Sequence, residues 1–290
     1  MKIDQVTVMV VHFRHDRTTH VQPTTMNSRL HAHLRSARIW RAIAWAMFMV
    51  LALAGGAAAQ TAVDLQLVLA VDASGSVDQV RFELQKRGYV AAFRHARVLQ
   101  AIRSGPNRAI AVTMVQWTGP ALQVQVVGWA LVGDEQSAAA FAAAIERAPR
   151  QLFGGGTSIS GAIDYAATLF PMSPFRASRR VIDVSGDGAN NNGPPVELIR
   201  DDVLAAGITI NGLPIMLKRP YAGSVDIENL DEYYEDCVIG GPGSFVIPIR
   251  EREKFIEATR TKLVLEIAGR QPQSRIVPTA SRTRRSCTIG

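Results

Sequence analysis

Cysteine and histidine are scarce in this 290-residue chain, and their scarcity excludes several kinds of site. Two cysteines cannot build a disulfide-rich scaffold or a cysteine-based zinc module. Five of the six histidines lie within the first 33 residues, which leaves His95 as the only histidine of the remaining chain. A histidine-based catalytic triad or a zinc site of several histidines is therefore not expected there. The sequence also lacks a Walker motif, a G-x-S-x-G motif and a C-x-x-C motif.

Basic residues outnumber acidic residues by 32 to 25, and the net charge of +7 alone suggests a nucleic acid or an anionic membrane as partner. The excess, however, lies at the two ends of the chain. Residues 1–59 carry seven basic and two acidic residues, and residues 271–290 carry four arginines and no acid. Residues 60–270 hold 21 basic and 23 acidic residues, a net charge of −2. We therefore expect no nucleic acid partner.

The first 59 residues have the pattern of a secretory signal. Arg35, Arg38 and Arg41 precede an apolar run at 42–56, and a small-residue stretch follows at 57–59. This order predicts a signal peptide cleaved after Ala59, in a chain whose more usual start would be Met26. The alternative is an uncleaved membrane anchor, but the run is shorter than the roughly 20 residues that a spanning helix needs. We expect a periplasmic or secreted protein without a stable membrane span after cleavage.

Strand patterns alternate with helix patterns from residue 60 to residue 270, which predicts one α/β domain with a doubly wound, mostly parallel sheet flanked by helices. Strands are predicted at 65–71, 109–117, 122–129, 180–185, 208–215 and 244–249, and helices at 77–102, 134–148, 158–170, 195–206 and 250–268. The strand at 122–129 follows a Gly119-Pro120 turn and is expected to be an antiparallel edge strand. Gly212 is expected to interrupt the strand at 208–215. Residues 271–290 are predicted to be a basic disordered tail.

Three segments place oxygen-bearing side chains just after predicted strands or at the start of a helix. They are Asp72, Ser74 and Ser76 after the strand at 65–71, Thr157 after the glycines at 154–156, and Asp187 after the strand at 180–185. In an extended exit from a strand, alternate residues point to one side. The carboxyl ends of parallel strands are where open α/β sheets bind their ligands. Thr157 is either the cap of the helix at 158–170 or a third hydroxyl ligand.

An oxygen-only donor set selects a hard cation, Mg²⁺ first, with Mn²⁺ or Ca²⁺ as possible substitutes. Three of the five donors are neutral hydroxyls, so two carboxylates at most match the charge of the ion. The metal then stays electrophilic, and an Asp or Glu side chain of a protein partner would complete its octahedron. The alternative is ordinary turn and cap chemistry, for which Asp, Ser and Thr are also favoured.

These motifs resemble the metal-ion-dependent adhesion site of von Willebrand factor type A (VWA) domains over about residues 62–268. The sequence is most similar to an uncharacterised bacterial group of exported VWA proteins, through the stretches RRVIDVSGDGANN (179–191), GITINGLPI (207–215) and YYEDCVIGGPGSF (233–245). The resemblance implies that Ser74, Ser76 and Thr157 ligate the metal and that Asp72 and Asp187 hold it directly or through water. One departure is Gly186, which stands where a threonine is frequent.

Three functions are compatible with this pattern. The first is a binding module that captures an acidic group through its cation. The second is a metal-dependent hydrolase, for example of phosphate esters. Against the hydrolase, the chain after residue 59 has one histidine, and no Lys or Arg lies near the three loops in sequence. Asp78 is the only spare acid beside the first loop. The third is an interaction protein whose metal site plays no part in binding.

Other chemistry-bearing residues have structural interpretations. Asp183 is expected to be a buried, hydrogen-bonded acid rather than a ligand, and His95 a half-buried packing residue on the helix at 77–102. The asparagines at 190–192 either rim the site or form a solvated turn. Six acids at 226–236 form a second cation site, a partner surface or a solvated segment. Cys237 and Cys287 could pair in an oxidising compartment, although Cys287 belongs to the predicted tail.

Overall fold

A five-stranded sheet forms the centre of the computed structural model, which describes residues 60–217, 229–269 and 287. The strand order is β4-β3-β2-β6-β7, with β2 (Leu65–Asp72), β3 (Ile110–Trp117), β4 (Gln123–Val132), β6 (Arg180–Gly186) and β7 (Thr209–Pro214). All neighbours are parallel except β4, which runs antiparallel to β3 at the edge. The predicted fold class is confirmed, including the antiparallel edge strand. The predicted signal peptide, most of the predicted tail and part of the acidic stretch lie outside the described residues.

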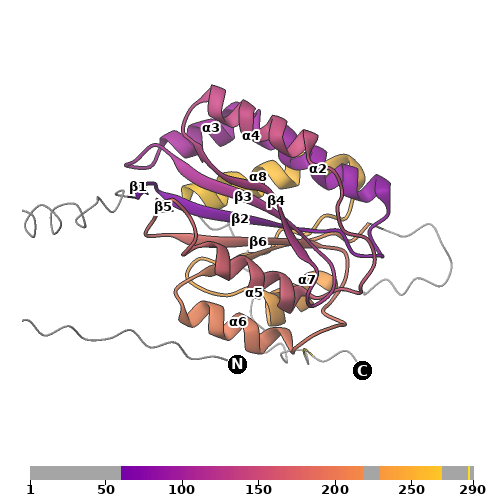
Figure 1. Cartoon of the computed structure of the whole chain (residues 1–290). Helices are drawn as coiled ribbons and strands as arrows, with labels where there is room; N and C mark the ends of the chain where they lie inside the picture. Colours follow the sequence, from indigo (N-terminus) through magenta and orange to yellow (C-terminus); the bar gives the residue numbers. More distant parts are fainter. Residues whose placement is uncertain (1–59, 218–228, 270–286, 288–290) are drawn as a thin grey trace, which may run out of the picture. The chain divides into compact units, whose positions relative to one another are not determined.

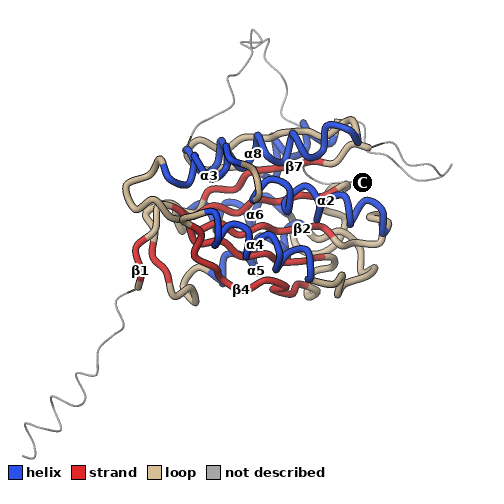
Figure 2. Tube along the Cα trace, turned by 90° about the horizontal axis from the view of Figure 1, so that it is seen from above, coloured by secondary structure: helices blue, strands red, loops and turns tan. Residues whose placement is uncertain are grey.

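Helices cover both faces of the sheet (Figures 1 and 2). One face carries α2 (Gln79–Phe93), α3 (Ala96–Arg103), α4 (Glu135–Arg147) and α8 (Phe255–Ala268). The other carries α5 (Ile159–Leu169), α6 (Val196–Ala205), α7 (Leu230–Tyr233) and the π-helix η1 (Tyr234–Val238). The remaining elements are a short parallel pair, β1 (Thr61–Ala62) and β5 (Phe175–Arg176), and the 3₁₀ turn η2 (Arg252–Lys254). None of the helices described is both long enough and apolar enough to cross a membrane.

Strand β2 is apolar almost throughout because both of its faces are covered. All eight of its residues are buried. Leu67 and Leu69 belong to the core under α2 and α8, whereas Val68 and Ala70 belong to the core under α5 and α6. A parallel strand between two helical layers therefore reads as one continuous apolar run, as the sequence predicts.

The single helix predicted at 77–102 is wrong, because the chain breaks between α2 and α3. His95 is extended (φ −93°, ψ 133°), and its Nδ1 accepts a hydrogen bond from the backbone N–H of Arg97 at 3.1 Å. It therefore caps α3. The apolar spacing continued across the break and concealed it. His95 is half-buried as expected, with its Nε2 lying 3.1 Å from Nη1 of Arg260.

Three boundaries near the end of the domain also differ from prediction. Gly212 does not interrupt β7, which pairs with β6 through that position. Residues 244–249 form no strand; Val246 bridges to Gly212 of β7, and Ile249 bridges to Ile215 just after it. The last helix begins at Phe255 after η2 rather than at residue 250.

The strand order places a topological switch point at the carboxyl ends of β2 and β6. From β2 the chain first adds β3 and β4 on one side of the sheet, and it later adds β6 and β7 on the other side. The loops that leave β2 and β6 thus diverge toward opposite faces of the sheet. Open α/β sheets bind their ligands at such a switch point.

Candidate metal centre

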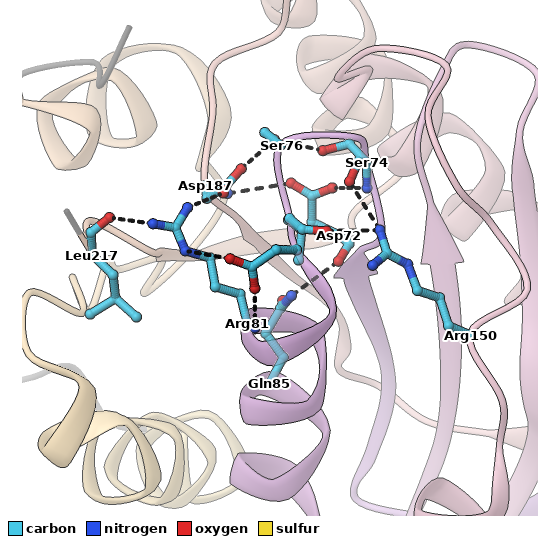
Figure 3. Close-up of polar contacts among 10 residues, drawn as sticks. Asp72, Ser74, Ser76, Arg81, Gln85, Arg150, Asp187 and Leu217 are labelled. Atoms are coloured by element: carbon cyan, nitrogen blue, oxygen red, sulfur yellow. Dashed lines mark hydrogen bonds and ion pairs between the residues drawn. The ribbon is translucent and has the colours of Figure 1, made fainter. Parts of the chain in front are cut away.

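The loop that leaves β2 turns back on itself through the side chain of Asp72. Asp72 is fully buried, and its Oδ1 accepts a hydrogen bond from the backbone N–H of Ser74 at 2.7 Å. The hydroxyl oxygens of Ser74 and Ser76 lie 2.9 Å apart. One carboxylate and two hydroxyls therefore meet at the carboxyl end of the central strand (Figure 3).

Asp187 joins this group from the end of β6. Its Oδ1 accepts a hydrogen bond from Oγ of Ser76 at 2.5 Å, and its backbone N–H donates to Oδ2 of Asp72 at 3.3 Å. Asp72 and Asp187 are 115 positions apart in sequence, and the β2–β6 pairing brings them together. The structure thus connects four of the five predicted ligands in one hydrogen-bonded group.

Thr157 lies beside this group and does not cap the helix that follows it. Ser158 caps α5, because its Oγ accepts from the backbone N–H of Gly161 at 3.1 Å. Oγ1 of Thr157 lies 3.6 Å from the position that a Cβ would take at Gly188, next to Asp187 in the chain. Asn191 fixes the backbone of Thr157 with two hydrogen bonds of 2.9 Å, one in each direction.

The glycine loop before Thr157 adopts a backbone that other residues rarely reach. Gly154, Gly155 and Gly156 have φ of +74°, +89° and +81°. A Cβ at Gly75 would lie 3.5 Å from Cα of Gly154, so the glycine loop and the β2 loop are in contact. Three consecutive residues in this region favour glycine for conformational reasons. The loop can therefore deliver Thr157 only with this composition.

The donor set fits a small divalent cation. Ligands of octahedral Mg²⁺ at 2.0–2.1 Å stand about 2.9 Å from their neighbours. The hydroxyl oxygens of Ser74 and Ser76 are 2.9 Å apart, which is the spacing of adjacent ligands. Oγ of Ser76 and Oδ1 of Asp187 are 2.5 Å apart, so these two oxygens would move slightly apart around an ion. In the part of the chain that the structure covers, no three His, Cys, Asp or Glu side chains are grouped to hold a metal ion. A cation would therefore depend on the hydroxyls.

Arg81 contacts the site directly, although it belongs to the helix that follows the β2 loop and not to one of the three loops. Its Nη1 donates to Oδ2 of Asp187 at 3.1 Å, and its Nη2 donates to the backbone oxygen of Leu217 at 3.1 Å. The side chain is only 4% exposed. Arg81 stands in the first turn of α2, five residues after Ser76. It neutralises much of the charge that Asp187 contributes to the site.

Arg150 is a second basic residue that the sequence analysis missed. Its Nη2 donates to the backbone oxygens of Ala73, Ser74 and Val77 at 2.9, 3.1 and 2.9 Å. The guanidinium also lies 5.2 Å from the ring centre of Phe82 and 4.8 Å from that of Phe153. Burial lowers the pKa of Arg150, and the negative charge of Asp72 opposes that effect. Arg150 stabilises the turn of the β2 loop. No sequence motif predicts this role of Arg150.

The carboxylate of Asp72 is strongly affected by its buried surroundings. Burial raises the pKa of Asp72 to about 7, and the nearby charge of Asp187 acts in the same direction. The backbone N–H groups of Ser74 and Asp187 act against it. A bound cation would favour the ionised form of Asp72, because opposite charges stabilise each other in a buried site.

Other predicted residues have structural roles. Asp183 is fully buried, pairs with Nζ of Lys262 at 2.5 Å and accepts a hydrogen bond from Tyr89, as a structural acid should. Asn190 accepts a hydrogen bond from the backbone N–H of Ser160 in α5, and Asn192 donates to the backbone oxygen of Gly155, so these two asparagines connect the segment after β6 to the elements beside Thr157. Cys237 and Cys287 form a disulfide with their Cα atoms 5.6 Å apart.

The strand order, with helices on both faces of a mostly parallel sheet, is that of the VWA Rossmann-like fold. The chain belongs to the family described as "Protein of unknown function (DUF1194)", whose profile matches residues 62–271. This is a VWA-like family. A search of curated proteins finds no match.

Solved structures share the fold at low sequence identity. The pilus adhesin SpaC from Lactobacillus rhamnosus GG is 13% identical over 71% of this chain and 30% of its own, with a TM-score of 0.50. Proximal thread matrix protein 1 from the mussel byssus is 13% identical over 72% of this chain and 49% of its own, with a TM-score of 0.51. A von Willebrand factor type A protein from Catenulispora acidiphila is 18% identical over 71% and 43%, with a TM-score of 0.48. The matched part is less than half of each of these chains.

Proposed function

We propose that this protein is an exported VWA-type binding module that holds one divalent cation and uses it to capture an acidic group of a protein partner. The residues that would hold the cation are Asp72, Ser74, Ser76, Thr157 and Asp187. Mg²⁺ is the first candidate, with Mn²⁺ or Ca²⁺ as substitutes. When bound, the cation supplies an electrophilic position for a carboxylate oxygen. The observation that carries the proposal is the hydrogen-bonded cluster of two serine hydroxyls and two carboxylates at the switch point.

The charge balance of the cluster supports an anionic partner. Arg81 pairs with Asp187, so a carboxylate that would otherwise offset the ion is already partly compensated. Asp72 contributes the other negative charge, and the remaining donors are neutral hydroxyls. A divalent cation placed there keeps an excess of positive charge. An incoming Asp or Glu side chain would cancel that excess, whereas a neutral ligand would not.

Export is the second part of the proposal. The signal-like pattern in residues 1–59 supports cleavage after Ala59, which leaves a domain at 60–270 and a basic tail at 271–290. The disulfide between Cys237 and Cys287 supports an oxidising compartment, because such bonds persist in the periplasm and outside the cell. We therefore place the protein in the periplasm or among secreted proteins.

A thermal-unfolding titration with metal tests the cation site. We expect Mg²⁺ or Mn²⁺ to raise the Tm of the purified protein, because a ligand at 100 times its Kd stabilises the folded state by about 2.7 kcal/mol. Ser76→Ala should remove most of this shift. Thr168→Ala is the matched control, because it deletes an exposed hydroxyl on α5 away from the site. Equal Tm values with metal and with EDTA, for wild type and both variants, would contradict the proposal.

A peptide-display selection in Mg²⁺ tests the partner chemistry. We expect selected peptides to require an Asp or Glu, to lose binding when that residue is changed to Asn or Gln, and to be released by EDTA. Binding that survives both EDTA and Ser76→Ala would instead support an interaction protein whose metal site plays no part.

The hydrolase alternative has less support from the structure. The carboxylate of Asp78, the spare acid, caps α2 by accepting from the backbone N–H of Arg81 at 2.8 Å. A surface cavity of about 340 Å³, lined by Arg180 and Thr209 among others, lies at the amino ends of β6 and β7, at the other end of these strands from the metal loops. A screen of phosphoester and peptide substrates with Mg²⁺ decides the matter. Turnover that Asp72→Ala abolishes would favour the hydrolase.

A further inference from the structure

Tyr234 has a buried hydroxyl that the proposed metal site does not yet use. The residue has no exposed surface, and its hydroxyl finds no hydrogen-bond partner within the described residues. A buried polar group without a partner costs on the order of 1–3 kcal/mol and calls for an explanation. Tyr234 opens the π-helix η1, a kind of helix that occurs frequently at functional sites.

The hydroxyl of Tyr234 and the carboxylate of Asp72 face the same small volume. A Cβ built on Gly186 would lie 2.9 Å from the Tyr234 hydroxyl oxygen, 3.0 Å from Oδ2 of Asp72 and 3.1 Å from Cζ2 of Trp117. The Tyr234 hydroxyl oxygen and Oδ2 of Asp72 are therefore separated by at most the sum of the first two distances. The tyrosine hydroxyl, which comes from another element, lies where a side chain at position 186 would begin.

The ring edge of Trp117 borders this volume. It is fully buried, and its Nε1 also lacks a hydrogen-bond partner in the described structure. Trp117 is the β3 residue that pairs with Asp72 in register. Oδ2 of Asp72 accepts a hydrogen bond of 3.3 Å from the backbone of Asp187, which leaves it capacity for another donor. One donor, the Tyr234 hydroxyl, and one acceptor, Oδ2 of Asp72, thus face one space that the Trp117 ring borders.

Two glycines and a disulfide hold the Tyr234 ring in position. A Cβ at Gly212 would lie 2.6 Å from Cδ1 of Tyr234, so β7 needs a glycine there to admit the ring. The backbone oxygen of Tyr234 accepts from the N–H of Ile239 at 2.9 Å. Cys237, in the same π-helix, is bonded to Cys287. The placement of the phenol is therefore built into three separate parts of the chain.

We propose that Tyr234 is a positioning residue of the metal site: its hydroxyl, which has no partner among the described residues, donates a hydrogen bond to Oδ2 of Asp72 once the cation is bound, directly or through one water. This inference rests on the proposed cation function. The hydrogen bond holds the carboxylate in the orientation that the cation needs. Groups that orient metal ligands in this way change metal affinity by 10- to 100-fold when they are removed.

The phenol is suited to act as a donor at neutral pH. Burial raises the pKa of Tyr234 well above its ordinary value, and the negative charge of Asp72 raises it further. The hydroxyl therefore keeps its proton beside an ionised Asp72. A phenolate in the same place would repel the carboxylate instead of orienting it.

Tyr234→Phe tests the inference in the full protein with its disulfide formed. The change removes one oxygen and leaves the ring in place. We expect the Kd for Mg²⁺, measured by calorimetry, to rise by about 10- to 100-fold. We expect the Tm in EDTA to stay the same or rise, because an unpaired buried hydroxyl has been removed. Tyr233→Phe is the matched control, because the Tyr233 hydroxyl accepts from the N–H of Asn190 instead, and it should keep the wild-type Kd.

The outcomes are distinct. A purely structural tyrosine would lower the Tm in EDTA and leave the Kd unchanged, and that result overturns the inference while the proposed function stands. If wild type binds neither Mg²⁺ nor Mn²⁺, the proposed function fails and the inference fails with it. Gly186→Ala is a second variant should Tyr234→Phe not fold. Its methyl group would enter the shared volume and should weaken Mg²⁺ binding, and a wild-type Kd in this variant would overturn the inference.

Discussion

Arg81 determines how much negative charge the proposed site presents to a cation. The guanidinium is buried against Asp187 and bonded to it at 3.1 Å. A buried ion pair of this kind is costly to break, because the remaining partner is left without compensation. Because of this ion pair, the site should bind a cation more weakly than two uncompensated carboxylates would. A cation whose charge the site offsets only in part can still attract an anion, and a module that captures acidic groups needs this property.

Removing the charge of Arg81 should tighten cation binding and weaken the metal-free fold. In Arg81→Gln, Asp187 offers its full charge to the ion, and we expect the Kd for Mg²⁺ to fall by about tenfold, which corresponds to about 1.4 kcal/mol. The Tm in EDTA should fall because Asp187 loses its buried partner. Arg87→Gln, an exposed change on the same helix, is the control. Calorimetry that shows equal or weaker binding in Arg81→Gln would refute this view.

At the scale of elements, a buried charge cluster joins α8 to two strands of the sheet. Lys262 and Glu266 on α8 are bonded to each other, Lys262 pairs with Asp183 of β6, and Glu266 accepts from Asn211 of β7. All four residues are at most 2% exposed. One lysine faces two carboxylates in this cluster. Burial, and then the charge of Asp183, raises the pKa of Glu266 to about 7, while Lys262 opposes the rise.

The cluster predicts how stability depends on pH. Because the pKa of Glu266 is raised on folding, the folded state binds more protons than the unfolded state between its ordinary pKa of 4.5 and about 7. The free energy of unfolding should therefore fall as pH rises through this window. Glu266→Gln keeps the shape and cannot ionise, so it should be more stable than wild type at pH 8 by about 1–3 kcal/mol and nearly equal at pH 4.5.

Urea unfolding of wild type and Glu266→Gln at both pH values measures this difference. Comparing the two proteins at each pH cancels the contribution of Asp72, which is present in both. A difference that does not change between pH 4.5 and pH 8 would show that Glu266 does not titrate as described.

The elements themselves were largely predictable, and the errors have clear physical causes. Burial on both faces makes β2 a continuous apolar run, and helix periodicity identified every major helix. The break at His95 escaped because a capping side chain stood on the apolar stripe. Gly212 was taken as a breaker because glycine weakens strands in general. Position 212 needs a glycine because the aromatic ring of Tyr234, a residue more than twenty positions away, packs against β7 there.

At the scale of the whole molecule, the disulfide closes a long loop that includes α8. Cys237 and Cys287 are 50 positions apart. Cys237 packs in the core under α5 and α6, so the bond fastens a residue near the end of the chain to the domain. In the chain-entropy description, closing a loop of this length stabilises the folded state by about 4 kcal/mol.

Loss of the disulfide should therefore destabilise the protein substantially. We expect the double variant Cys237→Ser, Cys287→Ser to lose about 2–4 kcal/mol of unfolding free energy in urea titrations. Reductant should lower the stability of wild type toward that of the double variant and leave the variant unchanged. If wild type and the double variant unfold at the same urea concentration, the bond does not contribute in the way that loop closure predicts.

The sequence by itself determined the alternation of strands and helices, the antiparallel edge and the five candidate ligands, because these depend on local periodicity and on residues just beyond strand ends. It did not reveal Arg81, Arg150 or Tyr234. Their contacts with the site depend on how α2, the glycine loop and the π-helix pack against the sheet. Only the tertiary structure decided which charges face Asp72 and Asp187, because electrostatic interactions depend on distance in space and not on distance along the chain.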